Sequence, residues 1–324
     1  MITLLKAGLL ATVQDLGRPG FRDSGMPVAG AMDRQAMAAA NLLVGNDPGA
    51  ATVELTLLGG TWRFEEEVLA AVAGADMSAT LDGAPVGPWS SFVARAGSQL
   101  AFKSARSGVR AYLAVRGGID VPVVLGSRST YARAGVGGFQ GRVLATGDRL
   151  PVGAALGSAP APLVLAPREI PPSGGGATLR VLLGPQDDRF TAEGIATFLS
   201  GGYRVTPQND RMGYRLEGPP IAMRGPADII TDPLVPGAIQ VPGGGQPIVM
   251  AADAQTTGGY IKIAAVIGPD LRLLGQARSP DLIRFTRITQ AEAVRAVKGE
   301  RDGLARLARR IASGAGGGER PWSP

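Results

Sequence analysis

The sequence predicts a mainly β protein with two β-rich halves and a few short helices. Glycine (48 residues) and proline (25 residues) are frequent in the 324-residue chain, and runs of Val, Ala, Gly and Thr favour strands and turns. Short apolar segments recur about every ten residues between Gly-, Asp- or Pro-containing turns, which is typical of closed or sandwiched β-architectures. With 45% hydrophobic residues, the chain is long enough to form two cores.

The first half, residues 1–155, begins with the pattern of a strand, a loop and a helix. Met1–Leu10 is expected to form the strand and Gln14–Gly30 the loop. Asp33–Leu43 is rich in Ala and Met, and Asp33 is placed to cap the helix that this segment predicts. Asp82-Gly83 predicts a hairpin turn. The remaining strands are expected at Thr52–Leu58, Gly60–Phe64, Val68–Ala73, Ala79–Leu81, Gly97–Phe102 and Val109–Val115.

A linker is expected over residues 156–176, where prolines and three consecutive glycines interrupt all periodicity. The second half, residues 177–288, has a helical segment near Asp188–Leu199 and further short strands. These strands are expected at Thr178–Leu183, Tyr203–Val205, Ile229–Ile230, Ala238–Val241, Pro247–Ala251, Ile261–Ile267 and Leu282–Arg287.

Residues 289–324 form a tail. Its apolar residues are close to helical spacing over Thr289–Ala312, although Gly303 weakens the middle of this segment. The final GAGGGERPWSP is expected to be disordered.

The absence of histidine and cysteine excludes several kinds of chemistry. Imidazole bases, Ser-His-Asp triads, thiolate nucleophiles and Cys/His zinc sites cannot be built from this chain. Any reaction must use Arg, Lys, Asp, Glu, Tyr, hydroxyl groups and backbone amides. No metal ligand can be assigned from the sequence.

The charge distribution argues against nucleic acid as a partner. The net charge is +6, and seven basic and four acidic residues of the tail account for half of it. The rest of the chain is too weakly basic for a phosphate-binding surface. The first residues lack the features of a signal peptide, and no apolar run approaches the roughly 20 residues that span a bilayer. We therefore expect a cytoplasmic protein that does not enter a membrane.

Two polar loops of the first half are candidate anion sites. Arg18 lies in a Gly-Arg-Pro-Gly turn, where its guanidinium either binds an anion or is simply solvated. The run Ser127, Arg128, Ser129 and Thr130 follows a glycine. Its hydroxyls and amides either hold phosphate or carboxylate oxygens or stabilise the turn by local hydrogen bonds.

Two polar motifs of the second half are the other candidates. In Asp210–Arg215, Arg211 and Arg215 are possible anion ligands, and a buried Asp–Arg pair is the alternative. The densest polar set follows an apolar strand, a common place for ligand groups. It begins with Asp253, a possible base or metal ligand, and ends with Lys262, which is either a cation for an acyl or phosphoryl oxygen or a surface residue. Between them lie Gln255, Thr256, Thr257, Gly258, Gly259 and Tyr260.

Taken together, the ordered motifs resemble one family. They are TVQDLGRPG, GAMD, NLLVGN, LAVRGGID, LGSRST, GDRL, DRMGYRLEG, GAIQVP, GQPIVM and DAQTTGGYIKIA. This set resembles the allophanate hydrolase subunit 2 family, which is also known as KipA or as the C subunit of 5-oxoprolinase. It is similar to the second part of the urea carboxylase carboxyltransferase domain. The resemblance runs from about Leu4 to Phe285.

The resemblance implies a fold, a partner and a reaction. The fold would be two cyclophilin-like β-barrel subdomains. The partner would be a KipI-like protein, the B subunit of 5-oxoprolinase, and a third, A-type subunit would complete hydrolysis. The chain would be the C subunit of an ATP-dependent 5-oxoprolinase, inactive alone, in which 5-oxoproline is phosphorylated and opened to glutamate. ATP and Mg²⁺ would be shared with the partner.

Two alternatives share this fold. One is a carboxyltransferase subunit that acts on urea or a related amide with a biotin carrier on another chain. The other is a KipA-like regulator that binds a KipI-like kinase inhibitor. No Met-Lys-Met sequence occurs, so this chain is not expected to carry biotin.

For the site, we expect Arg211 and Lys262 to contact anionic substrate or phosphoryl oxygens, with Asp253 orienting them or a metal. The tail lies outside the matched core, and we expect it to be dispensable for catalysis.

Overall fold

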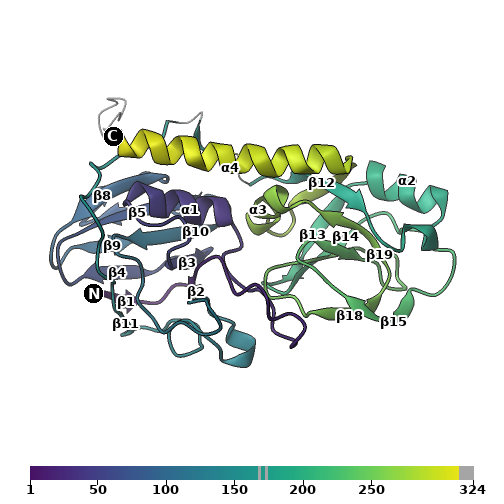
Figure 1. Ribbon diagram of the computed structural model, residues 1–324, viewed down its shortest axis with the longest axis horizontal. Coiled ribbons are helices and arrows are strands. Elements are labelled where there is room, and N and C mark those ends of the chain that lie inside the picture. Colours follow the sequence, from purple (N-terminus) through teal and green to yellow (C-terminus); the bar gives the residue numbers. More distant parts are fainter. Residues whose placement is uncertain (167–168, 172–173, 314–324) are drawn as a thin grey trace. The chain divides into compact units, whose positions relative to one another are not determined.

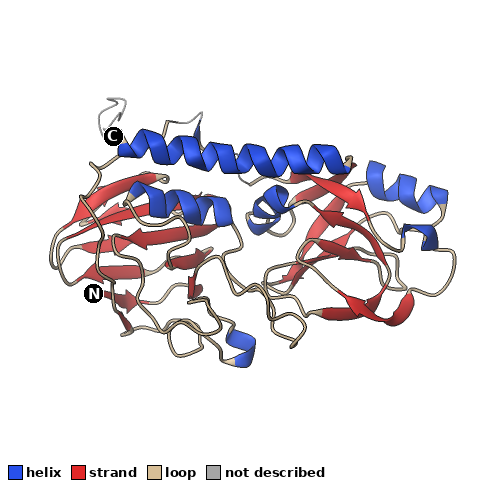
Figure 2. Cartoon of the chain, viewed as in Figure 1, coloured by secondary structure: helices blue, strands red, loops and turns tan. Residues whose placement is uncertain are grey.

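The computed structural model describes residues 1–166, 169–171 and 174–313. They form a mainly β fold, which confirms the predicted class (Figure 2). The chain divides into two compact units: unit 1 comprises the described residues of 1–18, 29–173 and 302–324, and unit 2 comprises residues 19–28 and the described residues of 174–301. The segment GAGGGERPWSP lies outside the described residues.

Unit 1 contains two sheets. The order of strands is β11-β1-β4-β9-β6-β7 in the first and β2-β3-β10-β5-β8 in the second. The first sheet consists of β1 (Ile2–Lys6), β4 (Thr61–Phe64), β6 (Thr80–Leu81), β7 (Ala84–Pro85), β9 (Gln99–Ala101) and β11 (Arg149–Leu150). The second consists of β2 (Leu10–Gln14), β3 (Thr52–Thr56), β5 (Val68–Asp76), β8 (Ser90–Ala94) and β10 (Ser107–Val115).

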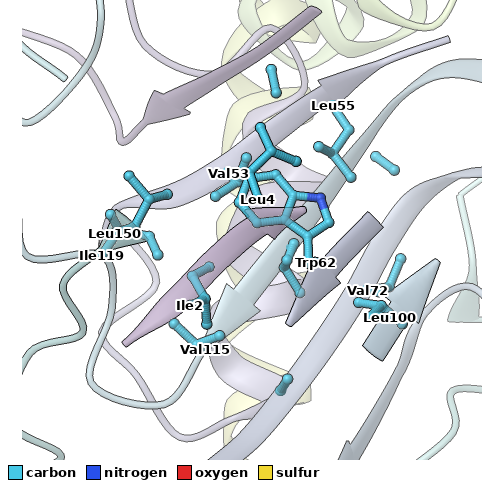
Figure 3. Close-up of a cluster of buried hydrophobic side chains, with 14 of the residues drawn as sticks. Ile2, Leu4, Val53, Leu55, Trp62, Val72, Leu100, Val115, Ile119 and Leu150 are labelled. Carbon is cyan, nitrogen blue, oxygen red and sulfur yellow. The ribbon is translucent and has the colours of Figure 1, made fainter. Parts of the chain in front are cut away.

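Apolar side chains from both sheets form the core of unit 1 (Figure 3). Trp62 of β4 and Leu4 of β1 are fully buried together with Val53 and Leu55 of β3. Burying one side chain of this size contributes about 1.5–3 kcal/mol. Strand β4 alternates between partly exposed and buried residues, whereas all residues of β3 are buried, so alternation marks a buried face in only part of these sheets.

Helix α1 (Arg34–Leu43) packs on the second sheet of unit 1, against β5 and β10 (Figure 1). Asp33 caps its start as predicted, since its Oδ1 accepts a hydrogen bond of 2.9 Å from the amide of Ala36. The chain expected to be a linker reaches the same cluster. Leu165 is 3% exposed and belongs to the same apolar cluster as the buried residues of α1. The amide of Ser91 also donates to the carbonyl of Leu163 at 2.8 Å.

Unit 2 is a closed barrel of seven strands in the order β12-β19-β16-β17-β14-β13-β20, accompanied by a two-stranded ribbon, β15-β18. The ribbon consists of β15 (Asp228–Pro233) and β18 (Thr257–Tyr260). The barrel strands are β12 (Ala177–Leu183), β13 (Tyr203–Asn209), β14 (Gly213–Glu217), β16 (Ala238–Gln240), β17 (Ile248–Met250), β19 (Lys262–Val266) and β20 (Leu282–Arg287).

Two short helices belong to unit 2, α2 (Ala192–Ser200) and α3 (Leu271–Gly275). The aromatic ring of Phe198 on α2 stacks on Phe285 of β20, with 4.5 Å between ring centroids. The longest helix, α4 (Gln290–Ala312), has residues in both units, divided after Arg301. None of the helices in the described part of the chain combines the length and apolar character needed to cross a lipid bilayer.

Some predicted boundaries were wrong. Met1–Leu10 is not one strand, because β1 ends at Lys6 and β2 begins at Leu10. The segment Thr257–Tyr260, expected to be a turn, is strand β18. The helix expected near Asp188–Leu199 begins only at Ala192, where Thr191 caps it, and a 3-10 turn covers Asp187–Arg189.

Candidate functional site

Strand pairing aligns four residues along one end of the barrel of unit 2. Arg215 on β14 lies opposite Ile248 on β17, Ile248 lies opposite Gln240 on β16, and Gln240 lies opposite Lys262 on β19. Neighbouring strands are about 4.8 Å apart, so the Cα atoms of Arg215 and Lys262 are on the order of 14 Å apart. We call this the Lys262 end of the barrel.

A small polar cluster surrounds Lys262, which is 4% exposed. Its Nζ donates a hydrogen bond to Oδ2 of Asp232 on the ribbon. Gln186 contacts both residues, because its Nε2 donates to the same Oδ2 at 3.2 Å and its Oε1 accepts from the amide of Lys262 at 3.1 Å. We call these three residues the Lys262 cluster.

The charges of the Lys262 cluster are unequally exposed. The Lys262 side chain is 5% exposed, whereas that of Asp232 is 38% exposed. The hydrogen bond from Lys262, followed by that from Gln186, holds the pKa of Asp232 below its ordinary value. The ammonium group of Lys262 is thus buried next to a carboxylate that is itself partly exposed. An anionic ligand that displaces or joins this carboxylate would gain a strong electrostatic contact with the ammonium group.

Strand β18 contributes four of the predicted site residues to the same region. Its Gly258 pairs with Asp232 of β15. A side chain at Gly258 would place Cβ 2.6 Å from Nε2 of Gln240 and 2.7 Å from Cδ1 of Leu234, so a larger residue here would push the ends of these two side chains aside. Gln240 in turn donates to the carbonyl of Tyr260 at 3.4 Å. The other members of this motif are Thr257 and Gly259 on β18, and Gln255 and Thr256 directly before it.

Arg211 and Asp253 form an ion pair at the opposite end of the same strands. The guanidinium donates from Nε to Oδ2 and from Nη2 to Oδ1, each at 2.8 Å, and the two side chains are 10% and 11% exposed. Because Arg211 precedes β14 and Asp253 follows β17, the strands separate this pair from Lys262 by on the order of 10 Å. The pair and the Lys262 cluster thus lie at different ends of these strands, and the Arg211–Asp253 contact has the geometry of a buried, doubly hydrogen-bonded ion pair.

An open pocket of about 470 Å³ lies at the Lys262 end. Arg215 and Glu217 of β14 line it together with Thr206 of β13. The chain that connects β16 and β17 forms the remaining wall, with Pro242, Gln246, Pro247 and Ile248 among its residues. Arg215 is thus the one arginine of the Asp210–Arg215 motif that faces this pocket.

The two polar loops of the first half come together in unit 1 around Asp15. Its Oδ1 accepts hydrogen bonds from the hydroxyls of Ser127 at 2.6 Å and Ser129 at 2.5 Å, and its Oδ2 accepts from the amide of Arg128 at 2.6 Å. The side chain of Arg18 is fully buried and donates to the carbonyl of Ser129. These interactions stabilise the joined loops.

The remaining residues of the serine-rich loop are also held by local contacts. Thr130 is 1% exposed, and its hydroxyl donates to the carbonyl of Val13 at 3.0 Å. Arg128 extends outward, where it forms an ion pair of 2.5 Å with Asp120. Of this set, the guanidinium of Arg128 is the group that reaches the surface, while Ser127, Ser129 and Thr130 are buried.

No group of three or more Asp and Glu side chains is placed to hold a metal ion among the residues that the structure describes. The carboxylate that contacts Lys262 is Asp232, a single acidic group already bound to that lysine.

Three residues of these clusters were missed by the sequence interpretation, namely Asp15, Gln186 and Asp232. Asp15 lies inside the motif TVQDLGRPG, and its position two residues before a glycine was a usable signal for a carboxylate that organises a turn. Gln186 and Asp232 carried no local signal. They lie 76 and 30 residues away from Lys262 in the sequence, so only barrel closure brings them together.

The fold that has to be matched is mainly β, with two sheets in unit 1 and a closed barrel in unit 2. The family model described as carboxyltransferase domain, subdomain A and B, matches residues 24–287, and the chain belongs to this family. It is 39% identical over 311 residues to the C subunit of 5-oxoprolinase from Escherichia coli strain K12, covering 96% of this chain and 99% of that protein. It is 36% identical to the 5-oxoprolinase C subunit of Haemophilus influenzae, covering 91% and 94%.

Solved structures support the same relationship. The urea amidolyase of K. lactis matches with a TM-score of 0.89 and 30% identity, covering 94% of this chain and 20% of that chain. A structure described as TTHA0988 matches with a TM-score of 0.80 and 35% identity, covering 88% and 55%. In both structures the matched part belongs to a longer chain.

Proposed function

We propose that this chain is the C subunit of an ATP-dependent 5-oxoprolinase that works with a KipI-like B subunit and a third, A-type subunit in the cytoplasm. The similarity to two relatives named as C subunits of 5-oxoprolinase supports it, since it extends over nearly their whole length. The observation that carries the chemical part of the proposal is the buried ammonium group of Lys262 beside the half-exposed carboxylate of Asp232.

The reaction needs positive charge rather than a histidine or cysteine. ATP phosphorylates the lactam oxygen of 5-oxoproline and ADP is released. Water then adds to the lactam carbon and the ring C–N bond breaks, which frees the amino group and leaves an acyl phosphate. A second water molecule hydrolyses the acyl phosphate to glutamate and phosphate. Negative charge develops on the lactam and phosphoryl oxygens during the first step. In this proposal Lys262 contacts those oxygens, and Asp232 and Gln186 hold its ammonium group in position.

The other predicted residues receive different roles. Arg215 and Arg128 remain candidates for binding substrate or phosphate oxygens, because both guanidinium groups are accessible. Residues 255–260 position the ribbon that carries the partner of Lys262. Arg211 and Asp253 hold the far end of the barrel, and Asp15 with Ser127, Ser129 and Thr130 holds two loops of unit 1. ATP and Mg²⁺ bind at a site that this chain shares with the B-type partner.

A glutamate-formation assay tests this proposal. The chain is purified with candidate A-type and B-type subunits and incubated with ATP and 5-oxoproline. Glutamate and ADP should form in equal amounts, and omission of ATP should abolish both. Formation of ADP without glutamate, or no turnover by a complex that is shown to assemble, would exclude the proposal.

A second candidate function is carboxyl transfer to urea or a related amide from a biotin carrier on another chain. It is favoured by 33% identity to the urea amidolyase of Saccharomyces cerevisiae, which covers 93% of this chain, and by the structural match to the K. lactis protein. The same complex is supplied with urea and with a biotinylated carrier that a separate biotin carboxylase has carboxylated from bicarbonate and ATP. Urea-dependent consumption of carboxybiotin would favour this second function.

A further inference from the structure

The pocket at the Lys262 end has the dimensions of a small-molecule site. Its volume of about 470 Å³ is within the range of roughly 300–1,000 Å³ that is usual for ligand pockets. All of its lining residues belong to unit 2. The wall is held in place by Gln246, which accepts from the amide of Gly218 at 2.8 Å and donates to its carbonyl at 3.1 Å.

Two opposite charges face this pocket without neutralising each other. Arg215 and Glu217 both line it, and both are exposed. They are two residues apart on β14, so they point to the same side of the strand, while Leu216 between them is buried. Within the described part of the chain, neither side chain forms an ion pair or a side-chain hydrogen bond.

The spacing of these charges limits the ligand. Two residues apart on a strand correspond to about 6.8 Å between Cα atoms. A ligand that bridges the two side chains needs an anionic and a cationic group a short distance apart, each forming a charge-assisted hydrogen bond of about 2.8 Å. The carboxylate and ammonium groups of an α-amino acid are joined through a single carbon atom and meet this requirement.

The remaining lining argues against the other common ligand classes. Glu217 repels the phosphates of a nucleotide, and no aromatic residue lines the pocket to stack on a base. Pro242, Pro247 and Ile248 offer an apolar wall for a short side chain. Thr206 adds a hydroxyl oxygen that is buried and has no hydrogen-bond partner among the described residues.

We propose that this pocket binds an α-amino acid in its zwitterionic form, with the carboxylate on Arg215 and the ammonium group on Glu217. The site is separate from the Lys262 cluster, although both lie at the same end of the barrel. The choice of L-glutamate as first probe rests on the proposed function, because glutamate is the product of that reaction. L-Alanine is the second probe, and its choice does not depend on that function.

Isothermal titration of the full chain, without ATP or partner proteins, tests this inference. Glutarate is the matched control ligand, since it is glutamate without the ammonium group. L-Glutamate should bind at least about tenfold more tightly than glutarate, the effect of one charge-assisted contact. Glu217→Gln should bring the two affinities to within about twofold of each other, and Arg215→Gln should weaken both ligands about tenfold or more.

Arg284→Gln is the matched control variant. Arg284 is an exposed arginine on strand β20 of the same barrel, and it does not line the pocket. Its substitution should leave both affinities unchanged. Saturable binding of L-alanine that Glu217→Gln abolishes would support the site even if the complex had no 5-oxoprolinase activity. Equal affinities for L-glutamate and glutarate, or no saturable binding of either amino acid, would overturn the inference.

Discussion

Lys262 is the residue on which the proposed chemistry depends. Its ammonium group is buried beside Asp232, so its charge is not dispersed by water and acts strongly on a nearby anion. Replacing Lys262 by Met keeps the approximate length of the side chain and removes the charge. We expect turnover of the reconstituted complex to fall about 30- to 1,000-fold, corresponding to about 2–4 kcal/mol of transition-state stabilisation.

The control for Lys262→Met is Lys298→Met, because Lys298 lies on an exposed part of α4. Melting temperatures of both variants are measured beside turnover. If Lys262→Met loses activity only in proportion to lost stability, or retains full activity, Lys262 does not contact the reacting groups.

The pKa of Asp232 can be measured to test its contact with Lys262. The hydrogen bond from Lys262 is the main cause of the lowered pKa of Asp232. A carboxyl group with a lowered pKa stabilises the folded state above its ordinary pKa, and this contribution is lost as the pH falls through the lowered pKa. In Lys262→Met we expect the pKa of Asp232 to rise toward the ordinary value of about 3.9.

Carboxyl-carbon NMR titration measures this change. Asp148 serves as an internal control, because its pKa is lowered mainly by the hydrogen bond from Arg142 in unit 1 and should not move. An unchanged pKa of Asp232 in Lys262→Met would mean that the ammonium group does not hold this carboxylate in solution.

Variants of Arg211 and Asp253 test whether this ion pair stabilises the fold rather than taking part in the reaction. Breaking a buried, doubly hydrogen-bonded ion pair leaves one charge without its partner. Arg211→Gln or Asp253→Asn should therefore lower the free energy of unfolding by about 3–5 kcal/mol. The double variant should cost less than the sum of the two single variants, because the pair acts as a unit.

Urea denaturation gives these free energies, and turnover of the complex is measured below the unfolding transition. Activity is expected to follow the folded fraction. Loss of activity in a variant of unchanged stability would instead place Arg211 and Asp253 in the functional site.

The sequence predicts individual polar residues better than their partners. The motifs containing Lys262 and Arg211 stand out because polar residues are dense there, and a buried Asp–Arg pair is one of the two interpretations of Asp210–Arg215. The counter-charge of Lys262 could not be predicted, since Asp232 reaches it only through the pairing of β15 with β18 and the closure of the barrel.

At the level of elements, the apolar segments predict most strands because these strands bury apolar side chains in the two cores. The pattern fails at β18, where Thr257–Tyr260 contains two glycines and few apolar residues. This strand is imposed by pairing with β15 and by the close approach of Gly258 to Gln240. Such a tertiary cause leaves no local signal in the sequence.

The prediction for the secondary-structure elements concerns the packing of helix α4. Leu307 and Ile311 pack against the apolar cluster that includes α1, and Arg310 forms an ion pair with Glu169. Leu307→Ala and Ile311→Ala should each lower the free energy of unfolding by about 1–2 kcal/mol, because both side chains are partly buried. Val297→Ala, at a position that is 42% exposed, should change it by less than about 0.5 kcal/mol.

Turnover of the folded complex should be unaffected by all three substitutions, in line with the expectation that the tail is dispensable for catalysis. Equal effects of the buried and exposed positions on denaturant unfolding would show that α4 does not pack in solution as it does in this structure.

On the scale of the whole molecule, the two β-rich halves were recognisable from strand spacing, but the exact course of the chain was not. Residues 19–28, which belong to the first half of the sequence, group with unit 2. The tail helix is divided between the two units in the same way. The assignment of these segments to the two units depends on contacts between residues that are distant in the sequence, and neither periodicity nor composition predicts such contacts.

The last prediction concerns the need for partner chains. The relatives that match over nearly their whole length are named as one subunit of 5-oxoprolinase, and in the matched urea amidolyase structure this region is 20% of a longer chain. We therefore expect the purified chain alone to form no glutamate from ATP and 5-oxoproline, and addition of its B-type and A-type partners to start turnover. Mixing the three proteins separately and in pairs, with glutamate measured by an enzyme-coupled assay, shows which combination is required. Lys262→Met should bind the partners like the unaltered chain while failing to support turnover. This result would distinguish failure of the complex to assemble from loss of the lysine charge. Robust glutamate formation by the isolated chain would contradict this prediction and place the complete site within these 324 residues.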